Sequence, residues 1–141
     1  MEDEKISQIR KMLDKSEYIK ELGIVVTEIS GGRATGKVPL DKKHLNPGGT
    51  MHGGCLYSLA DTVAGSLAYS MGADVVTVEG GLHFLEAAKD TEWVYCEAIV
   101  KRAGKCLVVV DVELKDDNKK LLDCGTFTYF RMDPKEEQDI S

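Results

Sequence analysis

The segment from Gly54 to Gly72 constrains the fold more than any other part of the sequence, because it is almost free of charge. Its only charged residue is Asp61, whereas the chain average of 30% charged residues would place about six charges there. The segment predicts a buried helix over residues 55–71, ended by Gly72 as a C-terminal cap. A helix that is apolar nearly all round must be covered on every side, by a sheet, another helix, loops or a second copy of the chain.

Strand-forming residues surround this helix in six runs that are separated by turn residues. The runs cover residues 24–29, 34–40, 75–85, 92–101, 107–114 and 121–131. The last four are joined by short turns, which requires antiparallel pairing because a parallel crossover needs a dozen or more residues. Apolar residues at helical spacing also predict an amphipathic helix over residues 6–22, ended by Gly23. The sequence therefore predicts an α+β fold, with an antiparallel sheet of about six strands around a long central helix.

The length and charge of the chain limit its class. A chain of 141 residues is expected to form a single domain, residues 1–132, followed by a polar tail at residues 133–141. The net charge of −6 disfavours a nucleic acid partner. The acidic start does not resemble a signal peptide and residues 56–71 are too polar for a membrane span, so we expect a cytoplasmic protein without a membrane partner. The four cysteines are expected to be reduced core residues.

Gly53 and Gly54 stand where a glycine-rich loop, residues 44–54, becomes the central helix. Backbone N–H groups in the first turn of a helix lack partners within the helix and lie at the positive end of its dipole. They can therefore bind an oxyanion. The alternative is that the two glycines only permit a tight entry into the helix. His52 favours the first interpretation, because its ring could hydrogen-bond a carbonyl there, although a loop histidine can equally be a cap or solvated.

Asp61 is the second candidate, since a lone acid in a buried helix either faces a cleft or suffers desolvation that raises its pKa. Such an acid is a candidate general base or nucleophile. The alternative is that it belongs to a polar stripe that faces solvent or a subunit contact, formed by Ser58, Asp61, Thr62 and Ser66. Asn46 is similarly open, because it can serve the site or cap the loop.

These residues form one pattern, Asn46-x-x-Gly49-x-x-His52-Gly53-Gly54 followed by Leu59-Ala60-Asp61. The pattern resembles the signature of the PaaI-type branch of the 4-hydroxybenzoyl-CoA thioesterase superfamily. The resemblance covers most of the chain, from the first predicted hairpin to the last predicted strand. It implies the hotdog fold and the hydrolysis of acyl-CoA thioesters without a metal or another cofactor.

The resemblance implies a role for each matching residue. Asp61 would be the general base or nucleophile, and the Gly53 N–H would polarise the thioester carbonyl. His52 and Asn46 would orient the thioester and the water. Thr77 would supply a hydroxyl group near that water.

Substrate-binding positions are expected at Gly54, Gly80 and Gly81. The chain departs from the family at the last two, because Gly80-Gly81 stand where the family usually has an apolar residue and Asn. Residues 85–88 also lack the proline that is common at this strand end. Both departures concern the acyl pocket and the coenzyme track, and both leave the catalytic set unchanged.

Three cations surround one predicted turn: Lys101, Arg102 and Lys105. They could bind the phosphates of coenzyme A, although charged turns are usually only solvated. His44 and His83 are expected to be structural. Three histidines without an i, i+4 pair predict no metal site.

Helix geometry bears on the oligomeric state. Asp61 follows Gly53 by eight residues, which is about 12 Å along a helix axis, so one thioester cannot meet both in a single chain. Two central helices packed antiparallel about a twofold axis would bring them together. We therefore expect a homodimer, or a tetramer of two dimers, with acyl-CoA as substrate. The alternatives are a non-catalytic acyl-CoA binding or sensing module, and a hydratase or dehydratase with a histidine–acid pair elsewhere in the helix.

Overall fold

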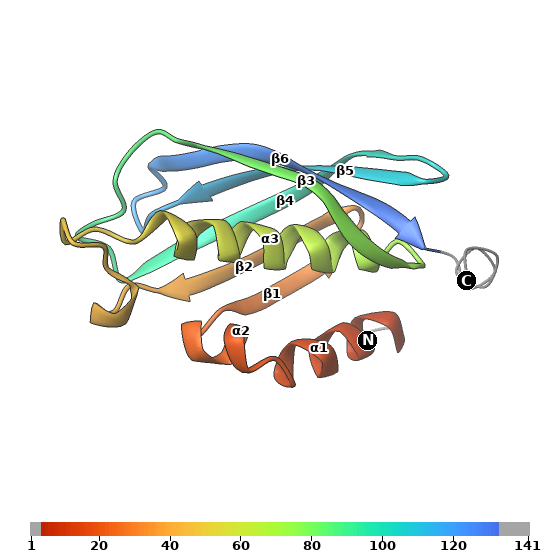
Figure 1. Ribbon diagram of the computed structural model, residues 1–141, viewed down its shortest axis with the longest axis horizontal. Helices are drawn as coiled ribbons and strands as arrows, with labels where there is room; N and C mark the ends of the chain where they lie inside the picture. Colours follow the sequence, from red (N-terminus) through yellow and green to blue (C-terminus); the bar gives the residue numbers. More distant parts are fainter. Residues whose placement is uncertain (1–3, 133–141) are drawn as a thin grey trace.

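A long helix, α3 (Gly53–Tyr69), lies against one face of an antiparallel sheet in the computed structural model, which describes residues 4–132 (Figure 1). Within these residues the sheet has six strands in the order β1-β2-β4-β5-β6-β3. In chain order they are β1 (Val25–Ser30), β2 (Arg33–Pro39), β3 (Asp74–Phe84), β4 (Trp93–Ala103), β5 (Leu107–Lys115) and β6 (Leu121–Met132). The predicted α+β arrangement is confirmed, and the predicted strand ends agree with the observed ones to within two residues. The predicted tail at 133–141 lies outside the described residues.

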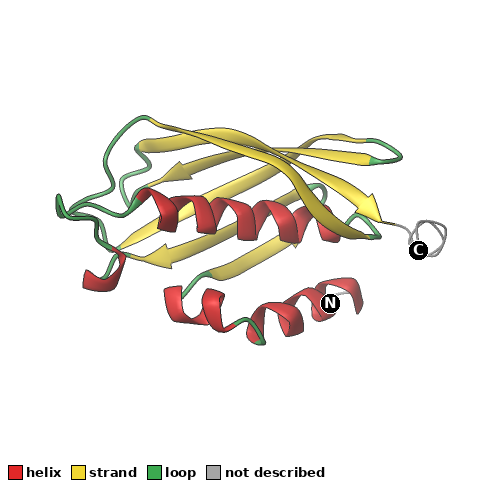
Figure 2. Cartoon of the chain, viewed as in Figure 1, coloured by secondary structure: helices red, strands yellow, loops and turns green. Residues whose placement is uncertain are grey.

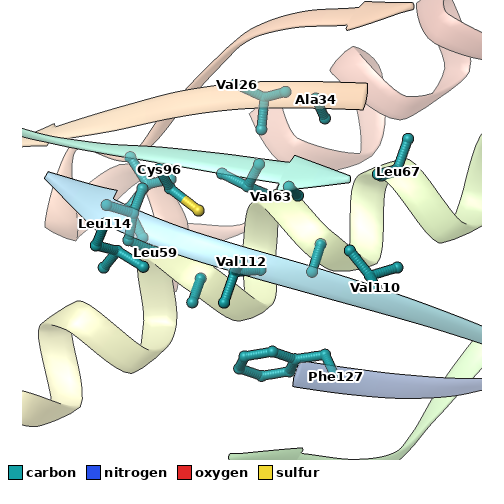
Figure 3. Packing of buried hydrophobic residues seen from close by; sticks show 14 of the residues in the cluster. Val26, Ala34, Leu59, Val63, Leu67, Cys96, Val110, Val112, Leu114 and Phe127 are labelled. Atoms are coloured by element: carbon teal, nitrogen blue, oxygen red, sulfur yellow. The ribbon is translucent and has the colours of Figure 1, made fainter. Parts of the chain in front are cut away.

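The core forms where the inner face of the sheet meets α3 (Figure 3). Leu59, Val63 and Leu67 recur at one-turn spacing on α3, and all three are fully buried. Alternate residues of β4 and β5 point to the same side of the sheet, and these are the buried ones. Gly36 on β2 permits the close approach of the helix, because a Cβ there would lie 2.5 Å from Val63 Cγ2.

The prediction of one N-terminal helix over residues 6–22 is wrong in one respect, because the structure has two helices there, α1 (Glu4–Asp14) and α2 (Glu17–Leu22). Ser16 stands between them with an extended backbone, and its hydroxyl accepts a hydrogen bond from the Ile19 N–H at 3.2 Å. Ser16 is therefore the N-cap of α2, a role that serine fills better than a place inside a helix. The predicted end of this segment at Gly23 is confirmed, with φ of 80° in the left-handed region.

The predicted end of α3 at Gly72 is also wrong. The helix ends at Ser70, the C-cap, whose hydroxyl donates to Leu67 O at 2.6 Å. Gly72 adopts φ of 116° in the turn that leads to β3. Its conformational freedom therefore permits the turn and does not cap the helix.

The two edge strands of the sheet differ in their cover. α1 and α2 lie beside β1, where Ile9 is buried and Arg10 Nη1 donates to Val26 O at 2.9 Å (Figures 1 and 2). At the other edge, β3 is paired with β6 on one side only, and Val76 and Val78 are 49% and 58% exposed. An edge strand with exposed apolar side chains is a typical place for pairing with another chain.

Candidate active site

The entry to α3 is built from His52 and the two glycines that follow it. His52 is the N-cap, with an extended backbone, and its Nδ1 accepts a hydrogen bond from the Gly54 N–H at 2.8 Å. An acceptor at Nδ1 places the proton of the neutral ring on Nε2. The exposed His52 therefore caps the helix through one nitrogen and keeps the Nε2–H as a donor for a ligand.

Gly53 carries the free backbone donor of this turn. The N–H groups of Cys55 and Leu56 donate to His52 O, and the N–H of Gly54 donates to the His52 ring. Among residues 4–132, no group accepts a hydrogen bond from the Gly53 N–H. A Cβ at this position would lie 3.3 Å from Phe84 Cε1, so glycine keeps the donor uncrowded. The arrangement is chemically suited to binding an oxyanion.

A pocket of about 320 Å³ opens beside Gly53. Leu56, Phe84 and Leu85 form its apolar walls, and Asn46 contributes an amide. This amide is already engaged, since Asn46 Nδ2 donates to Thr50 Oγ1 at 2.9 Å and Asn46 Oδ1 accepts from the Thr50 N–H at 3.1 Å. Asn46 therefore both lines the pocket and closes the loop.

Asp61 lies two turns further along α3 and is only partly buried. Its Oδ1 accepts a hydrogen bond from Tyr129 Oη at 2.9 Å. Tyr129 is a buried residue of β6. Burial and the neighbouring Asp61 charge raise the pKa of Tyr129, so its hydroxyl remains protonated and continues to donate. The carboxylate of Asp61 is thus oriented by a buried group and stays accessible.

Tyr129 is a candidate functional residue that the sequence interpretation missed. A signal was present, because alternation along residues 121–131 places Phe127 and Tyr129 on the same side of the strand. A buried tyrosine hydroxyl usually finds a hydrogen-bond partner. The alternation does not say which partner, since that depends on how β6 packs against α3.

Two other members of the predicted polar stripe, Ser58 and Ser66, bond to the backbone of their own helix. Ser58 Oγ donates to Gly54 O at 2.9 Å, and Ser66 Oγ donates to Thr62 O at 2.7 Å. Ser66 is buried, whereas Ser58 and Thr62 are partly exposed. Asp61 differs from these serines because its side chain accepts a hydrogen bond from Tyr129, a buried residue of the sheet, whereas the second partner of Ser58 is the exposed Tyr18 on α2.

The three β3 residues that were singled out have different surroundings. Thr77 is the partner of Tyr129 in the β3–β6 register, and the hydroxyl of Tyr129 donates to Asp61. A Cβ at Gly80 would lie 2.5 Å from Tyr57 Oη, so Gly80 allows α3 and β3 to pack closely. Gly81 lies in a separate hollow on the outer face of the sheet. The structure therefore places Thr77 beside the β6 tyrosine that contacts Asp61, and Gly80 and Gly81 outside the lining of the pocket at the helix entry.

The predicted phosphate-binding cations lie around the β4–β5 turn and are all exposed: Lys101, Arg102 and Lys105. Arg131 joins this turn to the C-terminal end of α3, because its guanidinium donates to Gly104 O and to Met71 O, both at 2.9 Å. The length of α3, about 25 Å, therefore separates these cations from Gly53 within one chain.

The expectation that all four cysteines are core residues is wrong for two of them. Cys55 and Cys96 are buried, and burial raises the pKa of both thiols, that of Cys55 to about 11. Cys106 is exposed beside the β4–β5 turn, beyond the reach of the core. Cys124 is half-buried because its side chain alternates to the outer face of β6, opposite His83.

Neither of the remaining histidines lines the pocket beside Gly53. His44 is buried and bonds to Leu22 O and to the Asp41 N–H, which agrees with a structural role. His83 is exposed on the outer face of β3, where no such role is evident. In the described part of the chain, no three metal-ligating side chains lie close enough to hold a metal ion. No helix within residues 4–132 is long and apolar enough to cross a membrane.

Comparison with known proteins identifies the class. The family model of the thioesterase superfamily matches residues 48–122, which is more than half of the chain. The chain therefore belongs to the thioesterase superfamily, as the resemblance in its sequence predicted, and it is a thioester hydrolase with the hotdog fold.

Three similar proteins place it more closely. A Saccharolobus solfataricus protein that bears the name esterase is 33% identical over 124 residues, which cover 86% of this chain and 87% of its own. The Escherichia coli acyl-coenzyme A thioesterase PaaI is 28% identical over 109 residues, 77% of this chain and 78% of that one. The solved E. coli PaaI structure aligns with a TM-score of 0.85 at 26% identity, over 92% of this chain and 94% of that one. A Streptococcus mutans protein bound to acetyl-CoA aligns with a TM-score of 0.73 at 26% identity, over 77% and 88%.

Proposed function

We propose that this protein hydrolyses acyl-CoA thioesters to the free acid and coenzyme A, with the Gly53 N–H as oxyanion donor and Asp61 as general base or nucleophile. The observation that carries the proposal is that the Gly53 N–H, which has no hydrogen-bond partner among residues 4–132, lies beside a pocket with apolar walls. The acetyl-CoA held by the similar S. mutans protein supports coenzyme A as the carrier of the acyl group.

The chemistry follows from where charge develops. Attack on the thioester carbon moves an electron pair onto the carbonyl oxygen, which the Gly53 N–H stabilises at the positive end of the helix dipole. In one route Asp61 takes a proton from the attacking water, and in the other its carboxylate attacks and water then hydrolyses the mixed anhydride. Collapse of the tetrahedral intermediate breaks the C–S bond, and the departing thiolate of coenzyme A takes the proton that Asp61 holds in the first route, or a proton from solvent in the second. Tyr129 orients the carboxylate in either route.

Two copies of the chain would complete each site, because one copy separates Gly53 from Asp61 by about 12 Å along α3. An antiparallel pair of α3 helices would place the Gly53 end of one against Asp61 of the other. The exposed apolar edge at Val76 and Val78 on β3 supports a partner at this side of the molecule. The same antiparallel pairing would carry the cationic β4–β5 turn of one chain toward the Gly53 end of its partner. There its cations could meet the phosphates of coenzyme A.

Thiol release from a panel of aryl, short-chain and medium-chain acyl-CoAs tests the activity. Wild-type protein should release coenzyme A from at least one of them, and Asp61→Asn should abolish that release while circular dichroism shows an unchanged fold. A folded wild-type protein that releases no thiol from any member of the panel would overturn the proposal.

A mixed dimer tests whether the sites are shared. Asp61→Asn is co-expressed with Asn46→Ala/His52→Ala under two affinity tags, and the purified heterodimer is assayed beside both parents. If each site takes residues from both chains, one site of the heterodimer contains all of the substitutions and the other contains none. About half of the wild-type activity should then return. A heterodimer as inactive as its parents would show that each site lies within one chain.

A further inference from the structure

The short helix α2 adds little to the core, since none of its six residues is fully buried. It is nevertheless held firmly, by the Ser16 cap at its start and by the left-handed Gly23 at its end. Each half of α2 is also linked by hydrogen bonds to the entry of α3. These hydrogen bonds indicate that α2 has a role other than packing in the core.

The first link starts at Tyr18 in the first turn of α2. Ser58 Oγ donates its only proton to Gly54 O at 2.9 Å, so the 2.6 Å hydrogen bond between Tyr18 Oη and Ser58 Oγ has the tyrosine as donor. The Gly54 N–H in turn donates to His52 Nδ1. Both polar groups of the Gly54 backbone are therefore held by side chains, and one of these side chains is held by α2.

The second link starts at Leu22, the last residue of α2. His44, the final residue of the short 3-10 helix η1 (Lys42–His44), accepts the Asp41 N–H at Nδ1, so its Nε2–H donates to Leu22 O at 2.7 Å. The backbone carbonyl of the same His44 accepts the His52 N–H at 2.7 Å. His44 is buried, so water does not compete for these bonds.

The two links end on either side of Gly53, one at the His52 N–H and the other at Gly54 O. Consecutive glycines have more conformational freedom than any other pair of residues, and no side chain of their own can restrain them. A backbone donor stabilises an oxyanion best when it is already fixed in place before the charge develops. The entry to α3 therefore needs an external restraint, and α2 supplies one.

We propose that α2 is a positioning element for the Gly53 N–H donor and acts through Tyr18 and His44. This inference rests on the proposed function, because α2 would position the backbone donor that the proposed function assigns to Gly53. Neither Tyr18 nor His44 needs to touch the substrate. Both restrain the turn at Gly53, whose N–H would contact the substrate.

Tyr18→Phe and Ser58→Ala test the first link, because they remove single hydroxyl groups from partly or fully exposed side chains and should preserve the fold. Each should lower kcat about threefold to tenfold at an unchanged KM, the range expected for one hydrogen bond. The double variant should lose no more than either single one, since both act through the same link. The matched control is Thr27→Val, which removes an exposed hydroxyl hydrogen bond of 2.7 Å to Thr35, away from α3.

Amide hydrogen exchange supplies a readout that does not depend on activity. Tyr18→Phe should accelerate exchange at Gly54 and Cys55, whereas Thr27→Val should not. His44→Gln, which retains one donor and one acceptor, should keep more of this protection than His44→Leu, which retains neither.

The outcomes separate the two proposals. A wild-type protein that releases no thiol overturns the proposed function, and hydrogen exchange still decides whether α2 restrains the turn. Wild-type kcat together with wild-type amide protection in Tyr18→Phe would overturn the role of α2. So would an equal loss of kcat in Thr27→Val.

Discussion

Two carboxylates of this protein, Asp61 and Asp123, differ in their exposure to solvent and in their hydrogen-bond partners. Asp61 on α3 is partly accessible, and Tyr129 donates a hydrogen bond to it. Asp123 on β6 is fully buried between Phe84 and Leu114 of the adjacent strands. Within residues 4–132, neither Asp123 oxygen has a hydrogen-bond partner, and burial raises the pKa of Asp123 to about 7.

The difference shows that burial alone does not mark a catalytic acid. A carboxylate that acts on a substrate must be accessible and held in one orientation, and Asp61 meets both conditions. Burial raises the pKa of Asp123, but its oxygens are inaccessible and no donor within residues 4–132 orients them. It is a destabilising group inside the core, whereas Asp61 is part of a site.

The largest expected effect is a difference in kcat between variants of the two acids. Asp61→Asn should reduce kcat by at least about 100-fold, because the amide can neither accept a proton nor attack the thioester. Asp123→Asn should retain kcat within about threefold, because this side chain touches no substrate. Thiol release at pH 7 measures both. Equal losses in the two variants would remove the distinction.

The next effect concerns stability and its pH dependence. Because the pKa of Asp123 is raised from 3.8 to about 7, the folded protein keeps a proton between these values that the unfolded chain releases. The contribution of Asp123 to stability is therefore complete below pH 3.8, falls as pH rises through this window, and reaches its lowest value above pH 7. Asp123→Asn should match the wild type near pH 4 and exceed its unfolding free energy at pH 8, by an amount on the order of 4 kcal/mol.

Urea unfolding of both proteins at several pH values measures this difference directly. The difference between the two proteins isolates Asp123, because the other carboxylates contribute equally to both. A difference that does not change with pH would mean that Asp123 stays charged, or finds a partner, in the folded protein.

A smaller effect is expected at the partner of Asp61. Tyr129→Phe removes the donor that orients the carboxylate and should lower kcat about tenfold at an unchanged KM. Tyr95→Phe is the matched control, because Tyr95 is an exposed tyrosine of β4 that faces away from α3. If Tyr129→Phe is as active as Tyr95→Phe, the accessible acid needs no orienting donor.

Removal of metal ions is expected to have no effect on the rate of thiol release. The proposed site uses a backbone N–H, a carboxylate and a phenol, so dialysis against EDTA should leave the rate of thiol release unchanged. Activity that is lost in EDTA and restored by a divalent ion would contradict this metal-free mechanism.

Local patterns were sufficient to predict much of this protein. Runs of strand-forming residues between turn residues identified the strands, and the near absence of charge between Gly54 and Gly72 identified α3, because these signals depend on residues close in sequence. The motif likewise pointed to Gly53 and Asp61. The break at Ser16 and the end of α3 at Ser70 were missed, since a hydroxyl residue that caps a helix looks in sequence like one that continues it.

The sequence by itself determined that the central helix would be buried, which turn would present free N–H groups, and which acid would stand alone in that helix. Only the tertiary structure decided the partners of these groups. Tyr129 meets Asp61 across 68 residues, Tyr18 meets Ser58 across 40, and Asp123 meets no donor within residues 4–132. Periodicity states the side of an element to which a residue points, but strand register and helix packing decide what it meets there, and these are properties of the whole folded chain.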